Sequence, residues 1–387
     1  MLTTLAISNY RSLRNLLVPL RRLNLITGPN GSGKSSVYRA LRLLAETAQG
    51  GVIPSLAQEG GLQSTLWAGP EKIGRATKRG DQKIQGTVRK DRINLRLGFA
   101  GDDFGYAIDL GLPAPSKSAF ALDPEIKTEC IWAGPMLRPA SLLVERRAAV
   151  VRTRNAVGEW DVLSYQLSTF DSMMSQFADP RNAPEMMALR ERIRSWRFYD
   201  HFRTDLEAPS RLPQIGTHTP ILSNDGSDLA AALQTIAEIG DPVALIGAVA
   251  DAFPGSSISV LNVEGRFEIA MHQHGLLRPL RAAELSDGTL RYLLWIAALL
   301  TPRPPGFLVL NEPETSLHPD LLPALGRLIA VAAEHSQVLV VTHAHSLIRA
   351  LEEYSECNSV QLEKEFGETK IVGVDQLDLP PWRWASR

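Results

Sequence analysis

The stretch Gly28-Pro29-Asn30-Gly31-Ser32-Gly33-Lys34-Ser35 matches in full the eight-residue pattern of a phosphate-binding loop, or P-loop. The apolar residues 23–27 before it predict a strand, and residues 35–47 after it place Val37, Leu41 and Leu44 at helical spacing. Such a loop needs a strand, a glycine-rich turn and a helix in this order. The glycines let backbone N–H groups point at a phosphate, and the positive end of the helix faces the same charge.

Seven residues of the loop and of the helix start are the predicted nucleotide ligands: Asn30, Gly31, Ser32, Gly33, Lys34, Ser35 and Ser36. The ammonium group of Lys34 would neutralise the β- and γ-phosphate oxygens, and the hydroxyl of Ser35 would coordinate Mg²⁺. The sequence therefore predicts ATP and Mg²⁺ as the bound species.

A second apolar run, residues 306–310, ends in Asn311-Glu312-Pro313-Glu314. A carboxylate at the end of a buried strand can orient the water that attacks a phosphate, so Glu312 is a predicted catalytic residue. Asn311 is a predicted metal ligand at the position where an Asp usually holds the hydration shell of Mg²⁺. Its amide carries no charge, and we expect weaker metal binding. Glu314 either supplies part of the missing charge or is a solvated loop acid.

Two further motifs belong to the predicted site. The turn Ser286-Asp287-Gly288 opens an apolar helix, and the Ser286 hydroxyl and the N–H groups near Gly288 predict an anion site. The apolar run 338–341 leads to His343, which we expect to hydrogen-bond the γ-phosphate and to sense its hydrolysis. His318 and His345 are further candidates for a role at the site.

Composition limits the classes of function. The net charge of -1 over 387 residues argues against a protein that binds polyanions with its whole surface. The longest apolar run, residues 292–300, is far shorter than the roughly 20 residues that cross a bilayer, so no membrane insertion is expected. Two distant cysteines and the absence of a signal-like N-terminus in this sequence predict a cytoplasmic protein.

The rest of the chain predicts several structural segments. Alternating residues in 85–112 indicate an antiparallel hairpin, and residues 258–271 indicate a second one around Glu264-Gly265. Residues 72–90 are rich in Lys and Arg, and form either a solvated loop or a surface for nucleic-acid phosphates. Residues 166–202 are expected to be helical. The aromatic cluster 196–203 is interpreted as a packing anchor, with a partner or nucleic-acid surface as the alternative.

In this order, the motifs resemble those of the ABC-type ATPases related to RecF, SMC and OLD proteins, and the whole chain is similar to predicted RecF-like AAA-family ATPases of bacteria. Residues 9–12 (Asn-Tyr-Arg-Ser) and 312–319 favour the RecF/OLD-like branch over the transporter branch. The resemblance implies an α/β P-loop fold of ABC type, with a mixed central sheet, an antiparallel β subdomain and a helical insertion. We expect residues 1–125 and 241–387 to form the two parts of the ATPase head, and residues 126–240 to form a mainly helical arm.

The resemblance also implies a mechanism. Two subunits would pair head to head, and Ser286 and Gly288 of each would contact the γ-phosphate bound by the other. Asp287 departs from the Gly that transporters have there, which puts the strength of this contact in doubt. A glutamine should join the nucleotide core to the arm, and Gln176 is the candidate, with Gln166 as its competitor. RecF and SMC relatives act on DNA, so DNA is a candidate partner beside an unidentified protein.

The leading hypothesis is a slow ATPase that forms an ATP-dependent homodimer and works as a DNA-linked switch in repair, genome maintenance or defence. One alternative is a nucleotide-gated regulator with little hydrolysis, because Asn311 weakens the expected metal site. A transporter ATPase subunit is a further alternative. The long insertion and the residues Leu317-His318-Pro319 argue against it.

Overall fold

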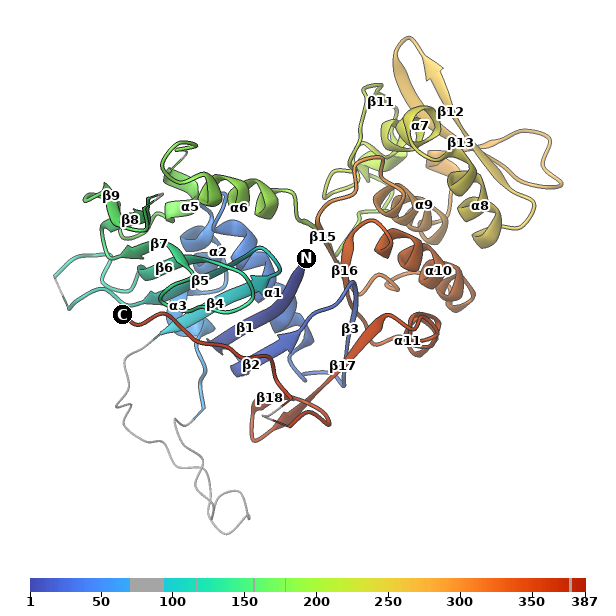
Figure 1. The fold of residues 1–387 in the computed structure, drawn as a ribbon. Coiled ribbons are helices and arrows are strands. Elements are labelled where there is room, and N and C mark those ends of the chain that lie inside the picture. The colour runs from blue at the N-terminus through green and yellow to red at the C-terminus, as the bar shows by residue number, and fades with distance from the viewer. Residues whose placement is uncertain (70–93, 116, 156, 178, 376–377) are drawn as a thin grey trace. The chain divides into compact units, whose positions relative to one another are not determined.

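The structure is a computed structural model that describes residues 1–69, 94–115, 117–155, 157–177, 179–375 and 378–387. The chain forms two compact units (Figure 1). Unit 1 comprises Met1–Arg21, Gly28–Trp196 and Val360–Arg387, and unit 2 comprises Arg22–Thr27 and Arg197–Ser359. The basic segment 72–90 lies outside the described residues.

Unit 1 contains an eight-stranded sheet in which all neighbours are antiparallel, in the order β2-β1-β4-β5-β6-β7-β8-β9. Its strands are β1 (Leu2–Tyr10), β2 (Leu13–Pro19), β4 (Leu95–Gly101), β5 (Phe104–Gly111), β6 (Glu125–Ala133), β7 (Leu142–Arg147), β8 (Val150–Arg154) and β9 (Trp160–Ser164). The first predicted hairpin is confirmed as β4–β5, which buries Leu95, Leu97 and Phe99 completely.

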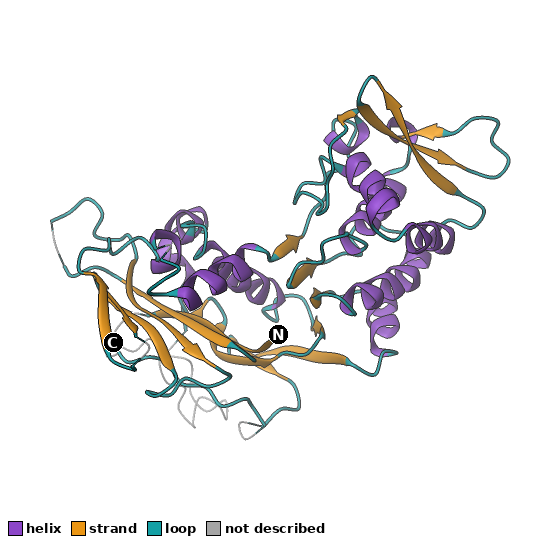
Figure 2. Cartoon of the chain, turned by 45° about the horizontal axis from the view of Figure 1, so that its top comes forward, coloured by secondary structure: helices purple, strands orange, loops and turns teal. Residues whose placement is uncertain are grey.

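The described residues of unit 1 form the helices α1 (Lys34–Glu46), α2 (Val52–Gln58), α3 (Gly61–Thr65), α5 (Met173–Gln176) and α6 (Pro184–Arg194). The predicted helix after the P-loop is confirmed as α1, and its residues Val37, Leu41 and Leu44 are all fully buried. Helix α1 contacts β1 and β4, so this apolar stripe packs on the sheet, and Figure 2 shows helices lying against the strands of this unit. The hairpin of β17 (Cys357–Glu365) and β18 (Glu368–Ile371) follows near the end of the chain.

The segment 126–240 differs from the expected helical arm. Its first part consists of strands β6 to β9, and the expected helix 166–202 is reduced to α5 and α6. Buried charged residues hide the strand pattern, because Glu129 and Arg146 are fully buried inside β6 and β7. The helical stretch ends before strand β10 (Arg197–Tyr199), in which Tyr199 is buried. Trp196 and Phe202 are buried as well, so the aromatic cluster is confirmed as a packing anchor.

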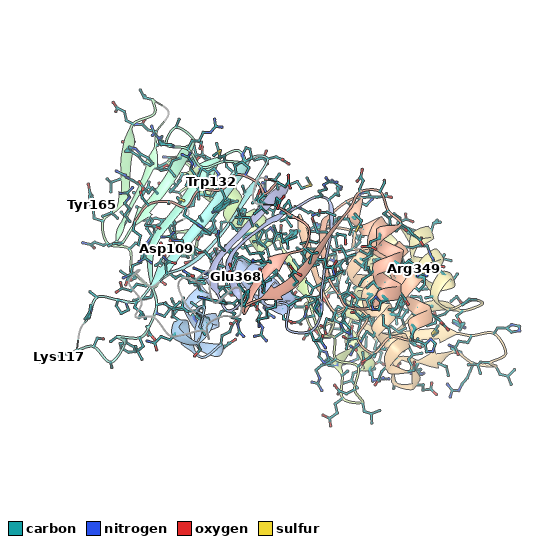
Figure 3. The ribbon with its side chains drawn as sticks, turned by 90° about the horizontal axis from the view of Figure 1, so that it is seen from below. Asp109, Lys117, Trp132, Tyr165, Arg349 and Glu368 are labelled. Atoms are coloured by element: carbon teal, nitrogen blue, oxygen red, sulfur yellow. The ribbon has the colours of Figure 1, made fainter. Side chains whose placement is uncertain are left out.

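The C-terminal residues lie against the sheet of unit 1. Trp382 stacks edge-on against Trp132 of β6, with 5.6 Å between the ring centroids, and against Trp384 at 5.2 Å. The guanidinium of Arg387 donates to both oxygens of Asp109, at 2.7 and 2.8 Å. Figure 3 labels Asp109 and Trp132 on this sheet. These contacts fix the end of the chain on β5 and β6.

Unit 2 is built around parallel strands in the order β10-β15-β16-β3. β15 (Phe307–Asn311), β16 (Gln337–Val341) and β3 (Leu23–Thr27) are almost continuously apolar and buried, as parallel strands covered on both faces require. Helices α9 (Asp287–Leu299), α10 (Leu322–Ala333) and α11 (His345–Glu352) belong to this unit.

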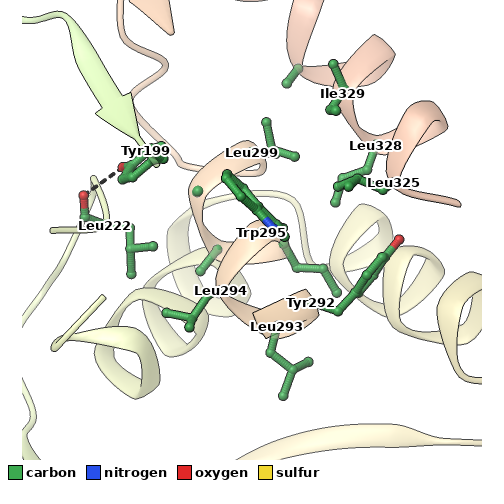
Figure 4. Close-up of a cluster of buried hydrophobic side chains, with 14 of the residues drawn as sticks. Tyr199, Leu222, Tyr292, Leu293, Leu294, Trp295, Leu299, Leu325, Leu328 and Ile329 are labelled. Atoms are coloured by element: carbon green, nitrogen blue, oxygen red, sulfur yellow. Dashed lines mark hydrogen bonds between the residues drawn. The ribbon is translucent and has the colours of Figure 1, made fainter. Parts of the chain in front are cut away.

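Helix α9 forms the centre of the core of unit 2. Its residues 290–299 are all buried, and the indole of Trp295 donates to the carbonyl of Pro313 at 3.0 Å. Figure 4 shows Trp295 among Leu299, Leu325 and Leu328. In the same view, the Tyr199 hydroxyl donates to the Leu222 carbonyl at 2.8 Å. The buried residues of α9 therefore hold the whole helix, including its start, against the apolar core of unit 2.

A small antiparallel sheet completes unit 2, with β13 pairing β11, β12 and β14. The predicted second hairpin is confirmed as β12–β13, and its turn residues Glu264 and Gly265 have the positive φ values 53° and 80°. The remaining elements of the unit are β11 (Gln214–Ile215), β12 (Ser257–Val263), β13 (Arg266–His272), β14 (Leu280–Arg281), α7 (Leu229–Ile239), α8 (Pro242–Ala252), and the 3₁₀ turns η1 (Pro209–Arg211), η2 (Ala282–Glu284) and η3 (Pro319–Leu321).

The two units confirm the predicted α/β class, with antiparallel and parallel sheets. Among the described residues, none of the helices combines the length and the apolar character that a membrane crossing needs.

Candidate nucleotide-binding site

The P-loop connects β3 to α1 and depends on glycine at two close approaches. A side chain at Gly28, where φ is 143°, would place its Cβ 2.3 Å from the Leu362 carbonyl oxygen. A Cβ at Gly33, where φ is 110°, would lie 2.3 Å from Oγ1 of Thr369. Only glycine fits both positions, because any larger residue would collide with neighbouring atoms in a backbone conformation that L residues avoid.

Polar groups that suit a phosphate line this loop. Lys34 is only 6% exposed, and its Nζ donates to the carbonyls of Gly28 at 2.6 Å and Pro29 at 3.2 Å. The hydroxyl of Ser32 is buried and has no hydrogen-bond partner among the described residues. A buried hydroxyl without a partner is costly, so it marks a place where a ligand oxygen is expected. The residues present therefore fit a bound phosphate.

The other predicted P-loop ligands lie nearer the surface. Asn30, Gly31 and Ser35 are exposed, while Gly33 and Ser36 are half-buried. Ser35 is the second residue of α1, where its hydroxyl stands at the N-terminal end of the helix. These positions suit groups that bind an outer phosphate or a metal ion.

Residues far away in the sequence hold the P-loop. Oγ1 of Thr369, on β18, donates to the Ser32 carbonyl at 2.7 Å and lies 2.8 Å from Oγ of Ser12. The backbone N–H of Thr369 also donates to the Ser12 carbonyl at 2.9 Å. Sequence reasoning noted Ser12 only as part of a resemblance and missed Thr369. No signal in the sequence could have joined two residues 357 positions apart.

A second group of predicted residues lies in unit 2, at the carboxyl ends of β15 and β16. The register pairs Asn311 with Val341, so Glu312 and His343 both follow at the same edge of the sheet. Nδ1 of His343 is 3.6 Å from Oε1 of Glu312. The structure thus brings together the two residues that were predicted to be catalytic.

Glu312 has a strained backbone and an accessible side chain. Its φ is 48°, and its N–H donates to the Val341 carbonyl at 2.7 Å. The side chain is 40% exposed, and that of His343 is 54% exposed. A non-glycine residue in the left-handed region costs about 1 kcal/mol or more, and such residues cluster at functional sites. The turn therefore keeps the Glu312 carboxylate accessible beside His343.

Of the two roles expected for Glu314, that of a solvated loop acid is wrong, because the side chain is only 7% exposed. Its Oε1 accepts hydrogen bonds from the Thr342 hydroxyl at 2.5 Å and the His343 N–H at 3.0 Å. Nδ1 of His343 is 3.4 Å from the same oxygen. Oε2 is buried without a hydrogen-bond partner among the described residues. Glu314 thus fastens the loop after β15 to the end of β16.

Asn311 retains a free acceptor at the end of β15. Its Oδ1 is buried and has no hydrogen-bond partner among the described residues. In the part of the chain that the structure describes, no three His, Cys, Asp or Glu side chains are grouped as a metal site would need. A metal bound through Ser35 and Asn311 thus remains a prediction, and a hydroxyl and an amide oxygen are chemically suited to Mg²⁺ and its water shell.

The two other histidines differ in position. His318 is the N-cap of η3, where its Nδ1 accepts from the Asp320 N–H at 3.3 Å, and its side chain is 70% exposed. His345 is the exposed first residue of α11. Among the described residues, neither forms a hydrogen bond or ion pair with Glu312, so their role at the site stays a prediction.

The turn 284–288 and the start of α9, also in unit 2, carry a third group of predicted residues and are called the signature turn from here on. Ser286 is exposed and caps α9, and its Oγ accepts from the Thr289 N–H at 3.2 Å. A Cβ at Gly288 would lie 3.3 Å from the Ser316 carbonyl. The helix start is therefore confirmed, while the binding of a phosphate in trans remains a prediction.

Gln176 is the exposed last residue of α5 in unit 1. Buried charges hold this short helix: Glu129 accepts from the Ser172 hydroxyl at 2.5 Å and from the Met173 N–H at 2.8 Å. Glu129 also forms an ion pair with Arg146 at 2.8 Å, and both side chains are fully buried. Gln166 is exposed and outside this network, in a turn where its N–H donates to Ser164 Oγ. The choice between the two glutamines stays a prediction.

Comparison with solved structures finds similar chains among SMC heads. The SmcHead bound to the C-winged helix domain of ScpA is 13% identical, with a TM-score of 0.49 over 97% of this chain and 98% of that chain. The SMC head domain from Thermotoga maritima is 15% identical, with a TM-score of 0.43 over 97% and 99%. The Smc head domain with an extended coiled coil derived from Pyrococcus furiosus, bound to the C-terminal domain of ScpA, is 12% identical, with a TM-score of 0.48 over 96% and 95%.

No curated protein matches the chain significantly. A family model described as "AAA domain, putative AbiEii toxin, Type IV TA system" matches residues 23–349, which is most of the chain. The match includes the P-loop, the signature turn, Glu312 and His343. It confirms the predicted membership of the AAA family. The chain therefore belongs to this family of AAA domains.

Proposed function

We propose that the protein binds ATP with Mg²⁺, hydrolyses it slowly, and forms an ATP-dependent head-to-head homodimer. The observation that carries the proposal is the register of β15, β16 and β3. These parallel strands end at one edge, where Val341 pairs with Asn311 on one side and Ile26 on the other. The P-loop follows β3, Glu312 follows β15 and His343 follows β16. Ligands of open parallel sheets bind outside the carboxyl ends of the strands.

Each predicted residue has a defined task in this function. Lys34, the Ser32 hydroxyl and the N–H groups of the loop bind the phosphates. Mg²⁺, held by Ser35 and by Asn311 through water, would neutralise charge on the phosphate oxygens. Glu312 orients the attacking water and accepts its proton, which its accessible side chain permits.

His343 supplies the switch. With Nδ1 on the side of Glu312 and Glu314, its other ring nitrogen is free to reach a γ-phosphate oxygen. Glu314 holds the His343 backbone, so loss of the phosphate contact can move the side chain while the end of β16 stays in place. Ser286 and Gly288 would complete the nucleotide site of the partner subunit.

The protein would act as a DNA-linked switch in repair, genome maintenance or defence. The family description includes the words "putative AbiEii toxin, Type IV TA system", which fits the defence role. DNA and an unidentified protein are the proposed partners beside the second copy of the chain, and the cytoplasm is the proposed location.

A second candidate is a nucleotide-gated regulator with little turnover. The specific observation in its favour is Asn311, whose buried Oδ1 brings no negative charge to the metal. ATP binding and dimerisation are the same in both candidates, and only turnover separates them.

Steady-state ATPase activity with Mg²⁺ tests the proposal, first without DNA and then with linear, gapped and single-stranded DNA. We expect slow turnover that one DNA form stimulates and that Glu312→Gln removes without loss of ATP binding. Measurable ATP binding with no turnover under any condition would instead favour the regulator.

Nucleotide binding itself is tested by Lys34→Ala in isothermal titration calorimetry with ATP and Mg²⁺. We expect no measurable binding and no pairing, since charge and geometry at the β- and γ-phosphates are both lost. Arg39→Ala removes an exposed cation from the same helix and should bind like the wild type. Wild-type affinity in Lys34→Ala would refute the nucleotide site.

A further inference from the structure

Arg211 belongs to none of the sequence motifs, and its guanidinium contacts the signature turn. It is the last residue of η1, and it is 4% exposed. We propose that Arg211 is the positioning residue that fixes the signature turn and neutralises Asp287, so that the turn can bind the nucleotide of a partner subunit. This inference rests on the proposed head-to-head function.

One side of the guanidinium holds the loop that follows β10. Nε donates to the carbonyls of Thr204 at 3.0 Å and Asp205 at 3.1 Å, and Nη2 donates to the Thr204 carbonyl at 2.8 Å. These are buried or partly buried carbonyls, which need donors because water does not reach them freely. The side chain is therefore anchored before it meets the signature turn.

The other side of the guanidinium holds the signature turn. Nη1 donates to the carbonyls of Ala282 at 3.1 Å and Leu285 at 2.7 Å, and Nη2 donates to Oδ1 of Asp287 at 2.6 Å. The contacts to Ala282, Leu285 and Asp287 surround the cap residue Ser286 on both sides. The orientation of the Ser286 hydroxyl and of the first N–H groups of α9 thus depends on Arg211.

A second buried arginine ties the same loop to α9. Arg291 is 5% exposed, and its Nη2 donates to the Phe202 carbonyl at 2.8 Å and lies 3.3 Å from Oγ1 of Thr204. Its Nη1 donates to the Thr315 carbonyl at 3.0 Å. The loop 202–205 is therefore fixed to α9 independently, and it gives Arg211 a rigid base.

Asp287 is the residue that departs from the expected glycine, and its pairing explains how it is tolerated. Its side chain is 62% exposed, while that of Arg211 is 4% exposed. An unpaired carboxylate at this turn would repel a γ-phosphate, since like charges at short range disfavour binding. The ion pair at 2.6 Å draws the carboxylate back to the guanidinium and cancels its charge.

Lysine could not replace Arg211 in this role. The planar guanidinium donates hydrogen bonds to two different segments, through Nη2 to the Thr204 carbonyl and through Nη1 to the Leu285 carbonyl. The guanidinium offers five N–H donors in a rigid fork, whereas an ammonium is a single point of charge with three donors. Arg211→Lys keeps the positive charge beside Asp287 but loses the fork of N–H donors. This variant therefore separates the effect of the hydrogen-bond geometry from the effect of the charge.

The first experiment compares dimerisation with nucleotide binding at the protein's own P-loop. Analytical ultracentrifugation with Mg²⁺ and the non-hydrolysable analogue AMP-PNP measures the dimer, and a fluorescent ATP analogue measures binding to the monomer at low protein concentration. Arg211→Lys and Arg211→Met should weaken the dimer at least about tenfold. Binding by the monomer should stay within about twofold of the wild type, because the hydrogen bonds of Arg211 described above all go to residues of unit 2, whereas the P-loop belongs to unit 1.

Arg203→Met is the matched control. Arg203 is an exposed arginine that pairs with Asp205 at 2.8 Å on the surface, and within the described part of the chain its guanidinium forms no hydrogen bond with the signature turn. This variant should dimerise like the wild type. Equal weakening by Arg203→Met would overturn the specific role of Arg211.

Asp287→Ala provides the second measurement, and it is decisive if Arg211→Met fails to fold. Its exposed side chain makes folding of this variant safe, and Arg211 remains in place. We expect several-fold weaker dimerisation, since the turn loses its tie to the guanidinium. Unchanged or tighter dimerisation would overturn the proposal, because it would mean that the bond between Asp287 and the guanidinium does not position the turn.

The outcomes distinguish this inference from the proposed function. A wild-type protein that binds AMP-PNP and stays monomeric would refute head-to-head pairing and this inference with it. A wild-type dimer that the Arg211 and Asp287 variants form equally well would refute this inference alone.

Discussion

The hydroxyl of Thr342 donates to Oε1 of Glu314 at 2.5 Å, and this bond ties the end of β16 to the loop after β15. The His343 N–H donates to the same oxygen. One buried carboxylate therefore fixes the two strand ends that carry Glu312 and His343. The second acidic residue of the Glu312-Pro313-Glu314 motif has a structural task that its sequence position does not reveal.

Glu314→Ala should lower the free energy of unfolding by about 3 kcal/mol, because the Thr342 hydroxyl and the His343 N–H lose a charged acceptor in a buried place. Glu314→Gln should cost less, since its amide oxygen can accept both bonds. Urea unfolding measures both variants. Glu353→Ala, which removes an exposed acid at the end of α11, should be neutral. Equal stability of Glu314→Ala and Glu353→Ala would contradict the role assigned to Glu314.

The sequence predicted those parts of the fold and the site that depend on local patterns. The P-loop, the cap at Ser286, the hairpins β4–β5 and β12–β13 and the strand before Glu312 are set by spacing within a few residues. The aromatic cluster was also correctly interpreted, since buried area is the usual task of such residues.

The remaining features depend on contacts between distant segments. Strands β6 to β9 were missed because buried Glu129 and Arg146 interrupt the apolar alternation that predicts a strand. Arg211 and Thr369 act through hydrogen bonds to residues far away in the sequence, and the sequence next to each of them contains no motif that predicts this role. Burial of Glu314 is likewise a property of the folded sheet, whereas an acidic residue taken by itself is most often exposed.

Thr369→Val should weaken ATP binding about tenfold, because the loss of one buried hydrogen bond to the Ser32 carbonyl is worth about 1–1.5 kcal/mol and loosens the loop that binds phosphate. The substitution keeps the shape of the side chain, so packing against Gly33 is preserved. Isothermal titration calorimetry with ATP and Mg²⁺ measures the effect. Lys370→Met, on the same strand but at an exposed ion pair with Glu365, is the control and should bind ATP normally. Wild-type affinity in Thr369→Val would exclude this support of the P-loop.

Asn311→Asp should bind Mg²⁺ more tightly and turn over faster, because it restores a negative charge beside the metal position. Without Mg²⁺ the same variant should be less stable by about 1–2 kcal/mol, since the buried Oδ1 position would then hold an uncompensated charge. Turnover as a function of Mg²⁺ concentration and thermal unfolding with and without Mg²⁺ give the two measurements. Asn262→Asp adds the same charge at an exposed position of β12 and should change neither. If Asn311→Asp leaves both unchanged, Asn311 is not at the metal.

Arg146→Met should lower the free energy of unfolding by about 3–5 kcal/mol, because Glu129 is left as an unpaired charge in a fully buried position. Adding Glu129→Gln removes that charge, so the double variant should recover part of the stability. Arg147→Met, at a side chain that is 51% exposed, serves as the control and should be nearly neutral. Urea unfolding of the three variants tests these expectations.

The same double variant tests the link to Gln176. Glu129 and Arg146 hold the start of α5, through bonds to Ser172, Met173 and the Asp171 carbonyl, and Gln176 ends this helix. A folded double variant should bind ATP normally and turn over more slowly, with the same phenotype as Gln176→Ala. Because structural damage alone would also weaken ATP binding, the separation of turnover from affinity is what identifies a role at the glutamine. Normal turnover in Gln176→Ala would shift the assignment to Gln166, and Gln166→Ala should then lose turnover instead.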